Sequence, residues 1–370
     1  MILYEYWQRQ ILVFLFWVLS LQLVGEQMQE ITIKVPKNHV LAQILEFEIS
    51  LQSIGEANRY YIDFQNPAYV LPFGMLYTAN AIQRFRNAHP EVEFLPLNTQ
   101  SPYVWHMGYF KSCGFEIGRG PGEAPGSESY LPISILSIEE IIRQANEEMI
   151  EPVEVIERKS VELAQVLTQQ ETGPIREMMS YSIREMFRNV IEHSHSPFIV
   201  YCAQYHPSKK SAEIAILDNG IGVLKSLSKN PYLSLTNDRE ALQWALLPGI
   251  SGKVFKGVKR DPNDAWQNSG YGLYAVSRLC GLGGKFLICS GDSAVSLKPK
   301  GKEVHPCCFP GTVLRLDLCS KDISQLRTIL AKIMKEGDEL ARQTNLDAPS
   351  PSAASRMLSE AFRKKDHDRN

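Results

Sequence analysis

Residues 212–222 read AEIAILDNGIG, an apolar run that ends in Asp218-Asn219-Gly220-Ile221-Gly222. A short apolar run before a polar, glycine-rich turn predicts a buried strand that ends near Asp218. An aspartate at a strand end can accept a hydrogen bond from an exocyclic amine. The glycines allow positive φ and a close approach of the backbone to a ligand. Taken alone, the run fits a tight turn between two strands equally well.

Upstream, residues 174–194 read PIREMMSYSIREMFRNVIEHS and predict one long helix. Glu185, Asn189 and Glu192 are spaced at i, i+4 and i+7, so they share one helix face. The amide oxygen of an asparagine is a neutral ligand for Mg²⁺, and a nearby carboxylate can orient or deprotonate a water or hydroxyl. Taken alone, a solvated polar face explains this spacing better.

Downstream, Asn268-Ser269-Gly270-Tyr271-Gly272-Leu273 opens a predicted helix, and Gly311-Thr312 opens a predicted strand. The N–H groups at a helix start and the positive end of the helix dipole favour phosphate. The stretch before this helix carries four basic residues that would suit a lid over the phosphates: Lys253, Lys256, Lys259 and Arg260.

The order of these four features resembles the N, G1, G2 and G3 boxes of the GHKL superfamily, whose ATP-binding domain has the Bergerat fold. The resemblance covers about 145 residues, and within the superfamily the phrase REMFRNVIEHS is most similar to the serine-kinase anti-sigma factors. It implies ATP and Mg²⁺ as cofactors. The roles it implies are Glu185 as the catalytic base, Asn189 as the Mg²⁺ ligand, Asp218 as the acceptor for the adenine amine, Gly220 and Gly222 beside the base, Gly270, Tyr271, Gly272 and Leu273 at the phosphates, and Thr312 in a hydrogen bond near adenine. His193 is either a phosphate contact or a structural histidine.

The resemblance leaves three functions open. The leading one is an ATP·Mg²⁺-binding regulatory protein that acts as a slow ATPase or a nucleotide-dependent switch. The first alternative is a serine/threonine kinase that acts on a STAS-domain partner, and the second is a non-catalytic interaction module that depends on nucleotide. A typical histidine autokinase is disfavoured, because residues 136–180 contain no histidine that could accept a phosphoryl group.

The first part of the chain alternates predicted strands at 31–35, 59–64 and 92–97 with predicted helices at 38–54 and 72–88, which indicates a small α/β domain. Residues 61–64 (YIDF), 71–76 (LPFGML) and 92–95 (VEFL) resemble a STAS domain. STAS antagonists carry a phosphorylatable Ser or Thr just before the glycine of this loop, but here Pro72 and Phe73 precede Gly74. The resemblance therefore implies a docking module for a protein partner. Any other small α/β domain is the alternative.

The sequence thus predicts an α+β protein, a Bergerat-type α/β sandwich preceded by a smaller STAS-like domain. The predicted division of the chain is an apolar extension or anchor at 1–27, the STAS-like domain at 28–117, a Gly/Pro-rich linker at 118–135, the GHKL domain at 136–335 and a polar, disordered tail at 336–370.

Composition and net charge limit the classes of partner and the cellular compartment that the sequence predicts. The chain has 370 residues, 44% of them hydrophobic, with a formal net charge of −2, so no global field attracts nucleic acid. Seven cysteines without a CxxC pair favour reduced thiols and a cytoplasmic protein. The apolar run at 11–24 leaves three interpretations: an extension from a misplaced start, a membrane anchor with cytoplasmic domains, or a signal peptide. The sequence also leaves a homodimer open.

Overall fold

A computed structural model describes residues 29–37, 40–255, 257–258, 270–299, 301–319 and 326–343. The described chain is of the α+β class, as the sequence predicted, with one parallel and one antiparallel sheet. The apolar run at 11–24 lies outside the described residues, as do Lys256, Lys259, Arg260, Asn268 and Ser269. Of the helices that are described, none is both long enough and apolar enough to cross a membrane.

The N-terminal layer is built on a parallel sheet of three strands in the order β1-β2-β3, with a helix after each of the first two strands. The strands and helices predicted between residues 31 and 97 are confirmed. Alternating apolar residues of the strands face the helices, which is the pattern that predicted them. The helical segment after β3 is divided in two at Gly108, which has a φ of 81°. The elements are β1 (Glu30–Lys34), α2 (Leu41–Leu51), β2 (Arg59–Asp63), α3 (Pro72–Ala88), β3 (Glu93–Leu97), α4 (Pro102–His106) and α5 (Tyr109–Ser112).

The second sheet is antiparallel and has five strands in the order β4-β5-β6-β8-β7. Its strands are β4 (Tyr130–Ser137), β5 (Phe198–His206), β6 (Ser211–Asp218), β7 (Lys285–Lys298) and β8 (Gly301–Cys319). The helices of this part are α6 (Ile138–Glu148), α7 (Pro152–Thr168), α8 (Pro174–Asn189) with a π-helical turn η1 (Val190–Ser194), α9 (Gly222–Leu227), α10 (Asp238–Ala245), α11 (Gly272–Gly283) and α12 (Leu326–Gln343).

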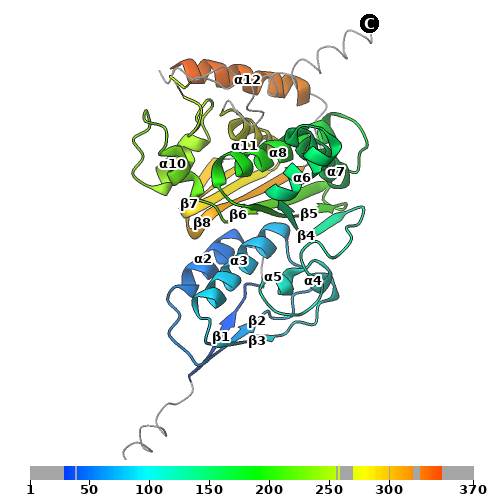
Figure 1. The fold of residues 1–370 in the computed structure, drawn as a ribbon, viewed down its shortest axis with the longest axis vertical. Helices are drawn as coiled ribbons and strands as arrows, with labels where there is room; N and C mark the ends of the chain where they lie inside the picture. Colours follow the sequence, from blue (N-terminus) through cyan, green and yellow to red (C-terminus); the bar gives the residue numbers. More distant parts are fainter. Residues whose placement is uncertain are drawn as a thin grey trace, which may run out of the picture.

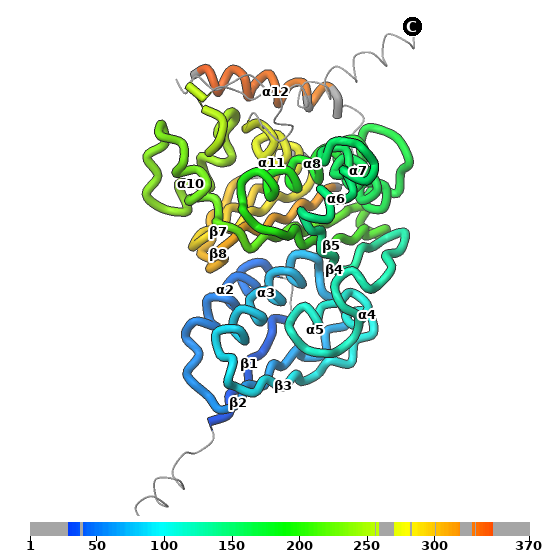
Figure 2. Tube along the Cα trace, viewed as in Figure 1, coloured from blue at the N-terminus to red at the C-terminus, as the bar shows by residue number. Residues whose placement is uncertain are grey.

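The five-stranded sheet is a central layer with helices on both faces (Figure 1). Helices α6, α7, α8 and α11 cover one face, and α2 and α3 of the N-terminal layer cover the other (Figures 1 and 2). Strand β6 contributes to a hydrophobic core on each face of the sheet. Ile214 and Ile216 pack in the core beneath α8 and α11, whereas Ala215 and Leu217 pack in the core shared with the N-terminal layer. A strand that is buried on both faces reads as a continuous apolar run, which is the pattern of residues 214–217.

Three predicted boundaries differ from the structure. Strand β4 begins at Tyr130, within the predicted linker, because it pairs with β5 at the edge of the sheet. Helix α12 runs to Gln343, past the predicted start of the tail at 336, because its apolar side buries Ile333, Met334 and Ala341. Strands β7 and β8 form a long hairpin whose pairing runs from Lys285 opposite Asp317 to Lys298 opposite Gly301, so β8 begins ten residues before the strand that Gly311 was predicted to open. Residues 344–370 of the predicted tail lie outside the described residues.

Candidate functional site

One cavity of about 100 Å³ brings together most of the residues that the sequence singled out. It lies on the side of the central sheet covered by α8 and α11. The predicted site residues in its wall are Asn189, His193, Asp218, Gly222, Gly270, Gly272, Leu273 and Thr312. Glu185, Gly220 and Tyr271 are not among the lining residues. Segments separated by more than 120 positions in the chain therefore meet at one place.

Asp218 is a buried carboxylate at the end of β6, with 3% of its surface exposed. Its Oδ1 accepts a hydrogen bond of 2.8 Å from the Gly220 N–H, and Thr312 of the neighbouring strand also donates to the carboxylate. Burial raises the pKa of Asp218 to about 7, although these hydrogen bonds oppose the shift. Asp218 is thus a buried acceptor that changes its charge near neutral pH.

The loop after Asp218 is fixed by close contact with the end of η1. The Ile221 N–H donates to the Ser194 carbonyl at 2.8 Å, and a Cβ on Gly220 would overlap that same oxygen. Gly220 is therefore required for close packing, and its φ is not positive. Gly222 does have a positive φ of 75°, as the sequence predicted for this run. The glycines position the loop and keep the cavity open beside Asp218.

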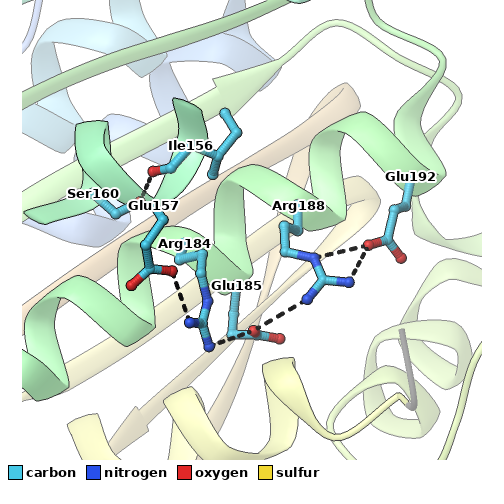
Figure 3. Close-up of polar contacts among 7 residues, drawn as sticks. All are labelled: Ile156, Glu157, Ser160, Arg184, Glu185, Arg188 and Glu192. Atoms are coloured by element: carbon cyan, nitrogen blue, oxygen red, sulfur yellow. Dashed lines mark hydrogen bonds and ion pairs between the residues drawn. The ribbon is translucent and has the colours of Figure 1, made fainter. Parts of the chain in front are cut away.

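Helix α8 carries Asn189 to the cavity as its last residue. The π-helical turn η1 follows directly, so the simple α-helical spacing that related Glu185 to Glu192 ends at Asn189. Turns of this kind are frequent at functional sites. Asn189 and His193 line the cavity, whereas Glu185 and Glu192 point into a buried ionic cluster (Figure 3).

Glu185 lies behind the start of α11, with only 1% of its surface exposed. Its Oε1 is 3.3 Å from Nη2 of Arg184 and 3.9 Å from Nη1 of Arg188 (Figure 3). Its Oε2 is buried and has no hydrogen-bond partner among the described residues. A Cβ on Gly272 would overlap this atom, so the glycine separates the carboxylate from the cavity.

Glu192 completes the cluster on the other side of Arg188. The Arg188 Nε and Nη2 atoms lie 3.1 and 3.0 Å from Glu192 Oε1 (Figure 3). Burial raises the pKa of Glu192 to about 8, with Glu185 adding to the shift and Arg188 opposing it. Burial and the charges of Lys253 and Lys229 lower the pKa of His193 to about 4, so this histidine is neutral at neutral pH.

The start of α11 presents Gly270, Gly272 and Leu273 to the cavity. Tyr271 points the other way: it is buried in the core, and its hydroxyl interacts with Asp338 of α12. Of the four basic residues predicted for a lid, Lys253 is the one described. Its side chain is exposed, and its charge acts on both Glu192 and His193. Lys253 therefore lies beside the candidate site.

Sequence reasoning missed the residues that close the cavity from the side of α9 and α10. These are Ser226, Leu227, Ala245, Ile250, Ser251 and Gly252, together with Ile288 and Leu314 of the sheet. The apolar members look like ordinary core residues in the sequence. The Ser251-Gly252 pair was the one local signal, because it directly precedes Lys253 of the predicted lid and binding residues are disproportionately found on loops.

The N-terminal layer reaches the loop that forms this site. The Asn80 side chain of α3 donates a 2.9 Å hydrogen bond to Asn219 Oδ1. Asn80 in turn accepts a 3.0 Å hydrogen bond from Arg84, which is paired with the buried Glu48 of α2. A polar chain therefore connects α2 and α3 with the residue next to Asp218.

The chain was compared with protein-family models, with curated proteins and with solved structures, and no match was found in any of the three.

Proposed function

We propose that this chain is an ATP·Mg²⁺-binding regulatory protein, and that the central sheet with its covering helices is a Bergerat-type domain of the GHKL superfamily. The observation that carries the proposal is the single cavity whose wall contains Asn189, Asp218, Gly272 and Thr312. A nucleotide site of this type accounts both for the order of the four segments in the chain and for their meeting at one cavity.

The character of the cavity fits the adenine end of a nucleotide. Val190, Ile250 and Leu273 supply apolar wall, and Asp218 supplies one buried acceptor. A flat heterocycle would bury its ring against the apolar wall, and its exocyclic amine would donate a hydrogen bond to Asp218. In small-molecule sites the lining is mostly apolar, and a few polar groups fix the orientation of the ligand. The Asp218 carboxylate is the group that would select an amine-bearing base.

The other end of the cavity fits phosphate and its cation. Gly270 and Gly272 stand at the start of the twelve-residue helix α11, where backbone N–H groups favour negative charge. Asn189 would hold Mg²⁺ through its amide oxygen. Mg²⁺ in nucleotide sites commonly takes few protein ligands and completes its shell with phosphate oxygens and waters. The cation would offset phosphate charge there.

The position of Glu185 supports a switch or a slow ATPase over rapid turnover. A general base must come within hydrogen-bond reach of the water that it activates. Glu185 is paired with Arg184 and Arg188 and is separated from the cavity by Gly272. Proton abstraction by Glu185 would therefore require its carboxylate to leave this cluster first.

The N-terminal layer, which we propose to be STAS-like, would contact a protein partner. The helix start at Pro72 and Phe73 is buried, and the Phe73 N–H donates to Glu213 of β6 at 3.0 Å. A partner would therefore contact another surface of the layer, and the outer face of the three-stranded sheet, with its exposed Glu30 and Glu93, is the accessible one.

Nucleotide binding measured by isothermal titration calorimetry tests the proposal. We expect ATP to bind more tightly with Mg²⁺ than without it, and Asp218→Asn to weaken binding about 10- to 100-fold, because an amide N–H₂ then faces the adenine amine in place of a charged acceptor. Asn189→Ala should remove most of the gain that Mg²⁺ provides.

Glu139→Gln is the matched control, because it neutralises an exposed carboxylate on α6 outside the cavity. It should bind ATP like the unmodified protein. The proposal fails if the unmodified protein binds no nucleotide, or if Asp218→Asn binds with unchanged affinity. With labelled ATP, release of free phosphate identifies a hydrolase, and labelling of a STAS-domain protein identifies a kinase. If ATP binds and both are absent, the protein is a switch.

A further inference from the structure

A second and larger cavity, of about 650 Å³, lies between the N-terminal layer and the central sheet. Val40, Leu41, Ala42 and Leu71 line it from the N-terminal layer, and the remaining lining residues come from strands β5 to β8 and their turns. It lies on the face of the sheet opposite the first cavity, because the lining residues Glu213 and Arg315 alternate with the core residues that face α8 and α11. The two cavities share no lining residue.

The three carboxylates in the wall of this second cavity all lie in ion pairs. Arg315 Nη2 lies 2.9 Å from Glu213 Oε2 and 3.3 Å from Asp317 Oδ2. Glu213 also accepts the backbone N–H at the start of α3. Lys298 Nζ lies 2.6 Å from Glu303, the third lining carboxylate. Each acidic side chain in the wall therefore has a cationic partner, and Arg315 is shared between Glu213 and Asp317.

The same wall holds four cationic side chains against these three carboxylates. Lys209 and Lys285 line the cavity, have exposed side chains, and form no ion pair with any of the residues that the structure describes. Nε of Arg315 is buried and has no hydrogen-bond partner within the same described set. A buried guanidinium N–H without an acceptor is costly, since such a donor loses its hydration on folding. The wall therefore offers two lysines and a buried donor to a ligand.

We propose that this cavity binds a small molecule bearing a phosphate group, with the phosphate between Lys209 and Lys285 and within reach of Nε of Arg315. Arginine and lysine are the side chains that recognise phosphate, the first through its planar fork and the second as a point charge. The ligand would contact the start of α2 and the end of the central sheet together. Its binding would therefore fasten the two layers to each other, independently of nucleotide in the first cavity.

Inorganic phosphate is the probe for this site. We expect phosphate to raise the thermal unfolding midpoint of the full chain in a saturable way, compared with sodium chloride of equal ionic strength. The double variant Lys209→Gln/Lys285→Gln should weaken the phosphate dependence at least tenfold. Lys332→Gln/Lys335→Gln is the matched control, because it removes two exposed lysines from α12, which lies on the other side of the sheet (Figure 1).

The control should keep the phosphate dependence of the unmodified chain, and circular dichroism without phosphate should show both double variants to be folded. Titration by calorimetry gives the affinity directly. Absence of a saturable phosphate effect would overturn the proposal. An effect that persists unchanged in Lys209→Gln/Lys285→Gln would overturn it too, because the anion would then bind elsewhere.

Discussion

Asp218 is the residue whose chemistry depends most on its surroundings. On a strand end in water it would be ionised at neutral pH, but burial raises its pKa to about 7. The folded protein therefore holds a proton that the unfolded chain releases above about pH 4. The contribution of Asp218 to stability accordingly falls as the pH rises from about 4 to 7, because the charged form is the one that burial disfavours.

If the adenine amine donates to Asp218 as proposed, the affinity for adenosine should increase between pH 6 and pH 8. An amine donor needs the ionised carboxylate, so we expect binding about tenfold weaker at pH 6 than at pH 8, as the fraction of ionised Asp218 falls. Adenosine lacks phosphates, so its own protonation does not contribute over this range. Chemical-shift titration by NMR measures the dissociation constant at each pH.

The Asp218→Asn variant supplies the control for this experiment, because its side chain does not titrate. Its weaker binding should not change between pH 6 and pH 8. A flat profile in the unmodified protein would contradict the prediction. If the variant keeps the full slope, the slope does not come from Asp218. Glu192, with a pKa of about 8, is then the next group to examine.

At the scale of elements, the packing of α11 against α8 determines what the cavity contains. The two helices approach closely at Gly272, whose missing side chain leaves space for the Glu185 carboxylate. The same contact keeps Glu185 with Arg184 and Arg188 and out of the cavity. One small residue at a helix start therefore determines both the helix packing and the position of a carboxylate.

Gly272→Ala should lower the free energy of unfolding by about 1–3 kcal/mol, the usual cost of adding a methyl group to a packed site. The new Cβ would displace the Glu185 carboxylate from its position. Gly281→Ala is the control on the same helix, because a Cβ there meets nothing within 4 Å. It should be neutral or stabilise by up to about 1 kcal/mol, since alanine is the better helix former. Urea denaturation measures both, and equal effects would contradict the packing argument.

At the scale of the whole molecule, the N-terminal layer and the central sheet share one hydrophobic core. Met75 and Tyr77 of α3 and Leu217 and Leu287 of the sheet belong to the same buried cluster. The Asn80–Asn219 hydrogen bond and the Phe73–Glu213 hydrogen bond add polar links across the same contact. A shared core of this kind predicts that the two layers unfold together.

Met75→Ala should therefore lower the midpoint of one cooperative transition for the whole chain. Truncating a fully buried methionine costs about 2–5 kcal/mol, which corresponds to several degrees for a protein of this size. Met149→Ala is the matched control, because that side chain is 92% exposed. Differential scanning calorimetry should give one peak in each case. Two peaks, with only one moved by Met75→Ala, would show that the layers unfold independently.

Local pattern was enough to predict most elements of this fold. The helix at 72–88 begins at a proline and carries the apolar residues Leu76, Ile82 and Phe85, and the strand that ends at Asp218 has an apolar run at 214–217 before the glycines. Such features arise from neighbouring residues, so a sequence contains them directly. The pattern was not enough for β4, whose first residues follow a Gly/Pro-rich loop and pair with a strand that lies about 70 positions further along the chain.

The residues available for chemistry could be read from local pattern: an asparagine on a long helix, an aspartate at a strand end, and glycines at a helix start. The tertiary structure alone decided where they lie. It placed Asn189, Asp218, Gly272 and Thr312 on one cavity, and it buried Glu185 between two arginines behind Gly272. It also created the ionic cavity at Arg315, which no local pattern indicated. The physical reason is that burial, charge pairing and pKa depend on what packs against a residue from elsewhere in the chain.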